Sequence, residues 1–348
     1  MKFTFNLNKK EFSMRKIKMF SLTASLVLAM TFTFSCDSGG GGGGGNNPGG
    51  GGGGKGDLQK WTVVKDSTLS IIYRIAYGNN RFIALDGSKM AYSANGISWT
   101  AVADNTFATG IEDIAYGGGR WVAMGWGGIA YSDDNGVTWT AGADSGLPNF
   151  NIAYGNNRWV AVGYSGYGGI AYSDDGINWT AVADNTIWDF TRTINNTTYA
   201  YTANVEGIAY GNNRFVAWSG EAGKMAYSDD NGVTWTAVTE SGFTTDIKAV
   251  AYGNNRFVAV AGRRIAYSDN GVTWTAVANS PFTTDIQDIA YGNNRFVAVA
   301  DIGTIAYSED NGVTWTAVED SKMSITFGIA YGNNRFVAVG TKIAYADW

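Results

Sequence analysis

The chain has 348 residues, no His and one Cys, with 14% aromatic and 16% charged residues and three Pro, a composition that indicates a large all-β body. The lack of His excludes Ser-His-Asp and Cys-His catalysis and His-ligated metals, and a single Cys excludes an intramolecular disulfide or a Cys cluster. Residues 1–35 hold six Lys/Arg and one Glu, so the remaining 19 basic and 29 acidic residues carry a net charge of −10. That balance argues against a nucleic-acid backbone as partner.

The first segment has the pattern of a secretory signal. A basic stretch at residues 15–18 precedes an apolar run at residues 20–34. The run is typical of a signal peptide and too short to span a bilayer comfortably. We predict a signal peptide over residues 1–35, with Met14 as an alternative start.

The single Cys, Cys36, directly follows this run. Phe34-Ser35-Cys36 resembles a bacterial lipobox, in which a small residue precedes a Cys that is cleaved and acylated. The resemblance implies a lipid on Cys36, and hence a protein of the bacterial cell envelope attached to the outer membrane or the cell surface. The alternative is an ordinary secretory signal that contains a Cys.

Gly-rich sequence follows Cys36 up to residue 56. Such a segment buries no apolar area, and random-coil scaling gives its 20 residues after Cys36 an r.m.s. span of roughly 25 Å. We therefore predict a lipidated Cys and Gly-rich tether over residues 36–56, followed by a folded body over residues 57–348.

The folded body repeats one unit. The string Ala-Tyr-Gly occurs seven times, with Tyr at 77, 116, 154, 210, 252, 291 and 331, so the spacings are 39, 38, 56, 42, 39 and 40 residues. One unit contains four short β-rich runs, at residues 288–292, 295–300, 304–308 and 313–318, each bounded by Asn, Asp or Gly. A period near 40 with four strands per unit predicts a β-propeller.

The two ends of the folded body complement each other. The last unit stops at Trp348 without a fourth strand, and Trp61-Thr-Val-Val64 matches the missing Trp-Thr-Ala-Val strand. We predict an all-β, monomeric, seven-bladed β-propeller of four-stranded blades, with the N-terminal strand closing the last blade. This closure removes an open sheet edge that invites aggregation.

A second repeated motif reads S-x-D-x-G-x-T-W. It starts at Ser132, Ser228 and Ser308, and copies one residue shorter start at Ser93, Ser173 and Ser268, the first of which has lost its Asp. The motif resembles the Asp-box, or BNR repeat, of sialidases and related β-propellers, which implies a sialidase-like superfamily fold. A calcium loop is the alternative, but the motif offers too few spaced oxygens and lacks the Glu at position 12 of an EF-hand.

We therefore predict that the Asp-box is structural and that the chain has no metal site and no cofactor. Its Asp can accept hydrogen bonds from backbone N–H groups, its Gly supplies a positive φ, and its Trp packs between blades. In the three full copies these residues are Ser132, Asp134, Gly136 and Trp139; Ser228, Asp230, Gly232 and Trp235; Ser308, Asp310, Gly312 and Trp315.

Each unit also carries an Asn-Asn-Arg turn, which reads Gly-Gly-Arg in the second unit. The arginines are Arg81, Arg120, Arg158, Arg214, Arg256, Arg295 and Arg335. A ring of arginines could bind an anion, but each lies at the same hairpin end and can pair with an acid of its own or the next blade. We favour structural pairing.

Loops alternate between the two faces of a propeller. The Asn-Asn-Arg turns and the Asp-boxes share one face, here called the repeat face. The opposite, variable face carries the loops between second and third strands and the links between blades. Long loops on a rigid framework often carry function, so ligand-binding candidates are sought there.

The candidates come from three parts of the variable face. The loops between second and third strands supply Trp126, Tyr164, Tyr167, Arg263 and Arg264. The long link at residues 185–207 supplies Trp188 and Arg192, unless it is a hairpin that packs its own aromatics. The starts of the inner strands supply Arg74, Asp113 and Asp288, which form either a polar-ligand site at the channel mouth or an internal salt bridge.

The leading hypothesis is a surface-anchored, non-enzymatic lipoprotein module that binds a protein or glycan through its variable face. The sialidase resemblance implies an alternative, a glycoside hydrolase with an arginine triad and a Tyr–Glu nucleophile. Tyr73-Arg74-Ile75-Ala76 lacks the Pro of the sialidase F/Y-R-I-P motif, and no Tyr–Glu pair is identified. Asp-box propellers also resemble the photosystem-assembly factor family, which implies a membrane-tethered assembly factor as a third possibility.

Overall fold

The computed structural model describes residues 58–65, 68–104, 110–142, 149–163, 169–183, 186–194, 197–220 and 223–347. These residues form seven four-stranded antiparallel sheets, which confirms the predicted fold class. The predicted signal peptide, Cys36, the tether, Tyr164 and Tyr167 lie outside the described residues.

Blades 1 to 6 each run from an inner to an outer strand in chain order. Their strands are β2 (Arg74–Gly78), β3 (Arg81–Leu85), β4 (Met90–Ser93) and β5 (Thr100–Ala101); β6 (Ile111–Gly117), β7 (Arg120–Gly125), β8 (Gly128–Ser132) and β9 (Thr140–Ala141); β10 (Asn149–Gly155), β11 (Arg158–Gly163), β12 (Ile170–Ser173) and β13 (Thr180–Ala181); β16 (Val205–Gly211), β17 (Arg214–Ser219), β18 (Met225–Ser228) and β19 (Thr236–Ala237); β20 (Ile247–Gly253), β21 (Arg256–Ala261), β22 (Arg264–Ser268) and β23 (Thr275–Ala276); β24 (Ile286–Gly292), β25 (Arg295–Ala300), β26 (Ile305–Ser308) and β27 (Thr316–Ala317).

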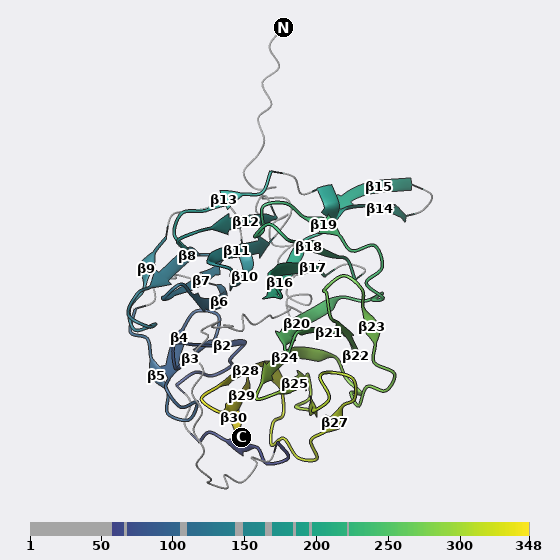
Figure 1. The fold of residues 1–348 in the computed structure, drawn as a ribbon. Coiled ribbons are helices and arrows are strands. Elements are labelled where there is room, and N and C mark those ends of the chain that lie inside the picture. Colours follow the sequence, from purple (N-terminus) through teal and green to yellow (C-terminus); the bar gives the residue numbers. More distant parts are fainter. Residues whose placement is uncertain are drawn as a thin grey trace, which may run out of the picture. The chain divides into compact units, whose positions relative to one another are not determined.

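Blade 7 is assembled from both ends of the folded body. It contains β28 (Thr326–Gly332), β29 (Arg335–Gly340), β30 (Ile343–Asp347) and, as outer strand, β1 (Thr62–Val63). Thr62 pairs with Tyr345, and Trp61 is 4% exposed in a core cluster of blades 6 and 7. The predicted closure by residues 61–64 is confirmed (Figure 1).

The inner strands make a closed ring. Each contacts the next in the order β2, β6, β10, β16, β20, β24 and β28, and β28 contacts β2 again (Figure 1). The hydrophobic clusters lie between neighbouring blades, where both faces of each sheet are covered. Such coverage explains why the second strands read as continuous apolar runs such as Arg-Phe-Val-Ala-Val.

The Asn-Asn pairs form the turns between first and second strands. Asn79 and Asn80 have φ of 46° and 59°, and the Asn pairs of the other blades are similar. Two consecutive residues with positive φ define a type I′ hairpin turn, which Asn and Gly adopt at least cost. Gly118 and Gly119 take the same positions in blade 2, with φ of 57° and 85°.

The seven Ala-Tyr-Gly strings interlock around the ring. The space that a side chain would fill at each Gly is occupied by the Tyr ring of the next blade. The pairs are Gly78 with Tyr116, Gly117 with Tyr154, Gly155 with Tyr210, Gly211 with Tyr252, Gly253 with Tyr291, Gly292 with Tyr331 and Gly332 with Tyr77. The last pair joins blade 7 to blade 1, so the motif is an interblade contact that closes on itself.

The long link after blade 3 forms a short 3-10 helix, η3 (Thr186–Trp188), and a separate two-stranded sheet, β14 (Asp189–Ile194) and β15 (Thr197–Thr202). In Figure 1 this hairpin stands outside the ring of sheets. Its base is tied to the propeller, because Lys224 Nζ donates to the Asp189 carbonyl at 2.9 Å. Within the described part of the chain, no helix is long and apolar enough to cross a membrane.

Candidate functional site

Each full Asp-box forms a turn whose Asp and Ser side chains hydrogen-bond to groups of the same turn. Asp134 Oδ1 accepts hydrogen bonds from the backbone N–H groups of Val137 at 3.1 Å and Thr138 at 2.9 Å, and Ser132 Oγ donates to it at 2.8 Å. Burial opposes ionisation here, but these hydrogen bonds together lower the pKa of Asp134 to about 2. The carboxylate is therefore committed to the turn, as the sequence predicts.

The Trp residues of the full boxes pack against the preceding blade. Trp139 is 5% exposed in a cluster with Ile83 and Leu85 of blade 1. Trp235 packs with side chains of blade 3, and Trp315 with those of blade 5. No group of three His, Cys, Asp or Glu residues in the described ranges could hold a metal ion.

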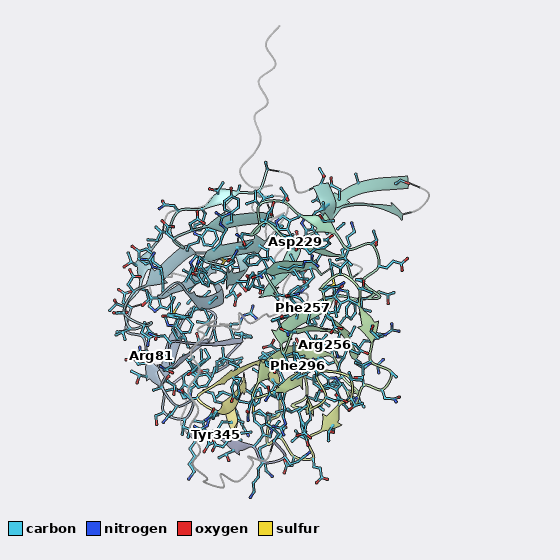
Figure 2. All side chains as sticks on the ribbon, in the orientation of Figure 1. Arg81, Asp229, Arg256, Phe257, Phe296 and Tyr345 are labelled. Atoms are coloured by element: carbon cyan, nitrogen blue, oxygen red, sulfur yellow. The ribbon has the colours of Figure 1, made fainter. Side chains whose placement is uncertain are left out.

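Six of the seven arginines of the Asn-Asn-Arg turns pair with an acid, which lies in an Asp-box in five blades and at the end of β30 in blade 7. The pairs are Arg120 with Asp133, Arg158 with Asp174, Arg214 with Asp229, Arg256 with Asp269, Arg295 with Glu309 and Arg335 with Asp347. Arg214 Nη1 also donates to the Asn270 carbonyl of the next blade at 2.5 Å, and its guanidinium lies 4.3 Å from the Tyr227 ring centre. The favoured structural pairing is therefore present for six of these arginines, while Arg81 donates to the Asn135 carbonyl of blade 2 at 2.6 Å. Figure 2 labels Arg81 and Arg256 of this set, with Asp229 and Tyr345 of other blades.

Three of the predicted ligand residues meet inside the ring. Arg74 Nε lies 3.0 Å from Asp113 Oδ1, and Asp288 interacts electrostatically with Arg74. The three residues are 2%, 0% and 0% exposed. The prediction of an accessible polar-ligand site at Arg74, Asp113 and Asp288 is therefore wrong, and the alternative of an internal salt bridge is the correct one.

The two aspartates also join neighbouring blades. Asp113 Oδ2 accepts from the N–H of Ile152 at 2.9 Å, and Asp288 Oδ2 accepts from the N–H of Ile329 at 2.9 Å. Burial raises the pKa of Asp113 to about 6, against the opposing effect of Arg74, and burial raises the pKa of Asp288 well above its usual value. This cluster joins neighbouring blades, although burial disfavours the charged forms of its two aspartates.

The remaining candidates differ in exposure. Trp188 is 1% exposed in the core between blades 3 and 4, so its proposed stacking on a ligand is wrong: its ring is covered by Val160, Phe215 and neighbouring apolar side chains. Trp126 is 56% exposed, and Arg263 and Arg264 are exposed. The backbone of Arg192 lies in β14, and its side chain does not belong to the described part of the structure.

Five exposed or half-buried apolar side chains belong to the variable-face loops and inner-strand starts of blades 6, 7 and 1. This variable-face patch comprises Ile71, Tyr73, Ile302, Ile325 and Phe327, and all but the half-buried Phe327 are at least 36% exposed. The rings of Tyr73 and Phe327 are 5.3 Å apart, which links blade 1 to blade 7. No sequence pattern predicts this patch, because single apolar residues in loops carry no periodic signal.

A cavity of about 640 Å³ opens on the repeat face. Its lining comes from the Ala-Tyr-Gly strings of blades 5, 6, 7 and 1 and from the Asn-Asn turns of blades 7 and 1: Tyr77, Gly78, Asn79, Asn80, Ala251, Tyr252, Ala290, Tyr291, Gly292, Ala330, Tyr331, Gly332, Asn333 and Asn334. None of these residues is among the ligand-binding candidates predicted from the sequence. Their recurrence at the end of every inner strand was the available signal, because those ends converge on the propeller axis.

Residues 54–245 and 239–346 match the family model described as the DUF6242 beta propeller domain. The chain belongs to this family. The description of this DUF6242 domain gives a fold and no activity. No curated protein sequence matches the chain.

Solved structures with the same fold belong to proteins of several kinds. YCF48 from Cyanidioschyzon merolae is 18% identical with a TM-score of 0.64, covering 82% of this chain and 98% of its own. A structure of YCF48 bound to a D1 peptide is 17% identical with a TM-score of 0.62, covering 83% and 94%. The GH74 enzyme of Niastella koreensis is 20% identical with a TM-score of 0.58, covering 79% of this chain and 43% of the enzyme. At these identities the likeness shows the fold alone.

Proposed function

We propose that this propeller is a non-enzymatic module that binds a protein segment through its variable face. The observation that carries the proposal is the distribution of exposed apolar side chains. Among the described residues, the large exposed hydrophobics of the repeat face are Val137, Val233 and Val313, one per Asp-box and well separated along the chain. Single surface hydrophobics of this kind need no explanation, whereas a contiguous patch marks an interaction site.

The loops that carry the patch are fixed to one another. Thr326, next to Ile325, donates through Oγ1 to the Ala300 carbonyl at 2.5 Å, which ties blade 7 to the loop that carries Ile302. The N–H of Ile72 donates to the Gly340 carbonyl at 2.9 Å, which ties the blade 1 link to blade 7. A patch on fixed loops loses little conformational entropy when a partner covers it.

Polar and charged side chains border the patch. Asp320 and Lys322 form an ion pair on the link before Ile325, and Lys342 is exposed on the next loop. An apolar centre with a charged rim is the usual composition of a protein interface. The YCF48 structure with a bound D1 peptide supports a protein as the partner class, since a propeller of the same fold there binds a peptide.

Matched substitutions on the two faces test this proposal. Ile325 and Val313 are 40% and 39% exposed, so Ile325→Asp and Val313→Asp place the same charge at equally exposed positions on opposite faces. Crosslinking in cells, followed by mass spectrometry, would compare both variants with wild type. We expect the proteins crosslinked to wild type to be lost with Ile325→Asp and retained with Val313→Asp. Equal recovery with both variants would reject the variable-face patch as the binding surface.

We also propose that Cys36 carries a lipid that holds the module at the bacterial cell envelope. The position of the single Cys directly after the apolar run supports this. Metabolic labelling with an alkyne fatty acid should modify wild type and leave Cys36→Ser unlabelled. An unlabelled wild-type protein released by salt washing would contradict the anchor.

A further inference from the structure

The cavity of the repeat face has an open rim and a small-residue floor. Asn79, Asn80, Asn333 and Asn334 are exposed at the rim, and the Tyr side chains below them are half-buried. Ala251, Ala290 and Ala330, which precede three of these tyrosines on the inner strands, complete the lining with small side chains. A volume of about 640 Å³ lies within the range of roughly 300–1,000 Å³ usual for small-molecule sites.

The lining combines aromatic rings with groups that both donate and accept hydrogen bonds. Tyr77 OH donates to Asn333 Oδ1 at 2.7 Å, and Tyr331 OH donates to Asn334 Oδ1 at 3.4 Å. A hydroxyl that donates in this way still offers lone pairs as acceptors, and each Asn carboxamide also supplies an Nδ2 donor. The Tyr recurs in all four lining blades, whereas the lining Asn residues come from blades 1 and 7, so donors and acceptors are concentrated on that side of the rim.

The lining contains no Asp, Glu, Lys or Arg. The tyrosines stay protonated near neutral pH, because burial raises the pKa of Tyr77 and Tyr331 above the usual value of 10.0. A charged ligand would lose hydration here without gaining an opposite charge, which is unfavourable. The lining therefore favours a neutral ligand with many groups that each both donate and accept hydrogen bonds.

We propose that this cavity binds a neutral oligosaccharide. Sugar hydroxyls donate and accept like the Tyr and Asn groups of the lining, and they recur at regular intervals, as the lining does. A peptide alternates side chains of differing chemistry, which matches a lining of recurring tyrosines and uncharged Asn groups less well. The site is distinct from the variable-face patch, so the inference stands independently of the proposed protein partner.

Two substitutions remove hydrogen-bonding groups with little risk to the fold. Tyr331→Phe deletes only a hydroxyl and keeps the ring that packs on Gly292. Asn334→Gly preserves the positive φ of 58°, and Gly119 already occupies the equivalent turn position in blade 2. Tyr154→Phe and Asn157→Gly are matched controls, because they make the same changes in blade 3, outside the cavity lining.

Calorimetric titration of the full chain would use neutral cello-, xylo- and manno-oligosaccharides, with sialyllactose and oligogalacturonate as charged comparisons. We expect a neutral oligosaccharide to bind, the two charged sugars to bind more weakly, and each lining variant to weaken binding about three- to tenfold, the loss of one hydrogen bond. The blade 3 controls and Ile325→Asp should bind as wild type, which separates this site from the proposed protein-binding face.

Several outcomes would overturn the proposal. These are an absence of binding to every neutral oligosaccharide, preference for a charged sugar, or equal loss in the lining variants and the blade 3 controls. Binding of the crosslinked partner's peptides that is lost with Asn334→Gly and retained with Ile325→Asp would reassign the cavity to a protein ligand. Circular dichroism of each variant would confirm that the fold is intact.

Discussion

The interlocked Ala-Tyr-Gly ring predicts that Gly292→Ala destabilises the propeller. A methyl carbon at Gly292 would lie 2.5 Å from Cδ2 of Tyr331 and closer still to Cγ and Cδ1. Carbons in contact are about 3.5–4 Å apart, so the ring or the strand must shift by roughly 1–2 Å. Tyr331 cannot move freely, because its ring packs on Phe336 with centroids 4.7 Å apart.

Overpacking of this kind costs about 1–3 kcal/mol, and the lower entropy of the unfolded chain offsets about 0.4–1 kcal/mol. We therefore expect a net loss of about 1–2 kcal/mol from Gly292→Ala, and a fall in Tm of roughly 2–8 °C at about 2–4 °C per kcal/mol in a large domain. Thermal unfolding followed by circular dichroism measures this shift.

A double-mutant cycle tests the cause. In a Tyr331→Ala background the added methyl meets no ring, so Gly292→Ala should be neutral or slightly stabilising. Gly119→Asn is the control, since a side chain there meets no atom within 4 Å and six blades carry Asn at that position with φ between 56° and 59°. An unchanged Tm for Gly292→Ala, or the same loss with and without Tyr331, would refute the interlocking ring.

Three further predictions concern closure and charge. Trp61→Ala should cost about 3–5 kcal/mol, because Trp61 is 4% exposed in the closing blade, and an unchanged denaturation midpoint would contradict closure by β1. Ala94→Asp should give Arg81 the acid that six other blades have, raising stability by about 0.2–1 kcal/mol in a way that disappears at high salt. Asp113, with its pKa raised from 3.8 to about 6, binds its proton more tightly when folded, so stability falls as pH rises through that window. Asp134, with its pKa lowered to about 2, loses its contribution as pH falls below about 4, so Tm should peak near pH 4, and a profile flat from pH 4 to 7 would contradict this.

The sequence predicts the blades because their signal is local and repeated. Seven copies of one unit, each with short runs bounded by Asn, Asp or Gly, are enough to place the strands. The match of Trp61-Thr-Val-Val64 to the missing outer strand also predicts the closure, since the ring leaves one open position.

The burial of the polar residues inside the ring could not be predicted from the sequence. Sequence reasoning placed Arg74 and Asp288 at the ring centre but could not say whether a ligand reaches them. Their burial depends on neighbours in other blades: Arg74 donates to the Glu112 carbonyl and pairs with Asp113 of blade 2, and a side chain at Gly328 of blade 7 would lie 3.6 Å from Asp288 Oδ2. Such fitting depends on side-chain size at positions far apart in the chain, and no local pattern records it.

The sequence also could not predict that repeated framework residues line a cavity together. Tyr77, Tyr252, Tyr291 and Tyr331 belong to the framework, because each ring packs on a Gly of the neighbouring blade. Yet a residue repeated at the inner end of every blade is also brought to the axis, where the copies jointly line a cavity that no single repeat contains. A structural role therefore does not exclude a binding role in a closed ring. The repeat face can offer a regular rim to a regular ligand, while the variable face, where the blades differ, offers an irregular surface suited to a protein. The matched variants Asn334→Gly and Ile325→Asp separate these two roles, because each alters one face alone.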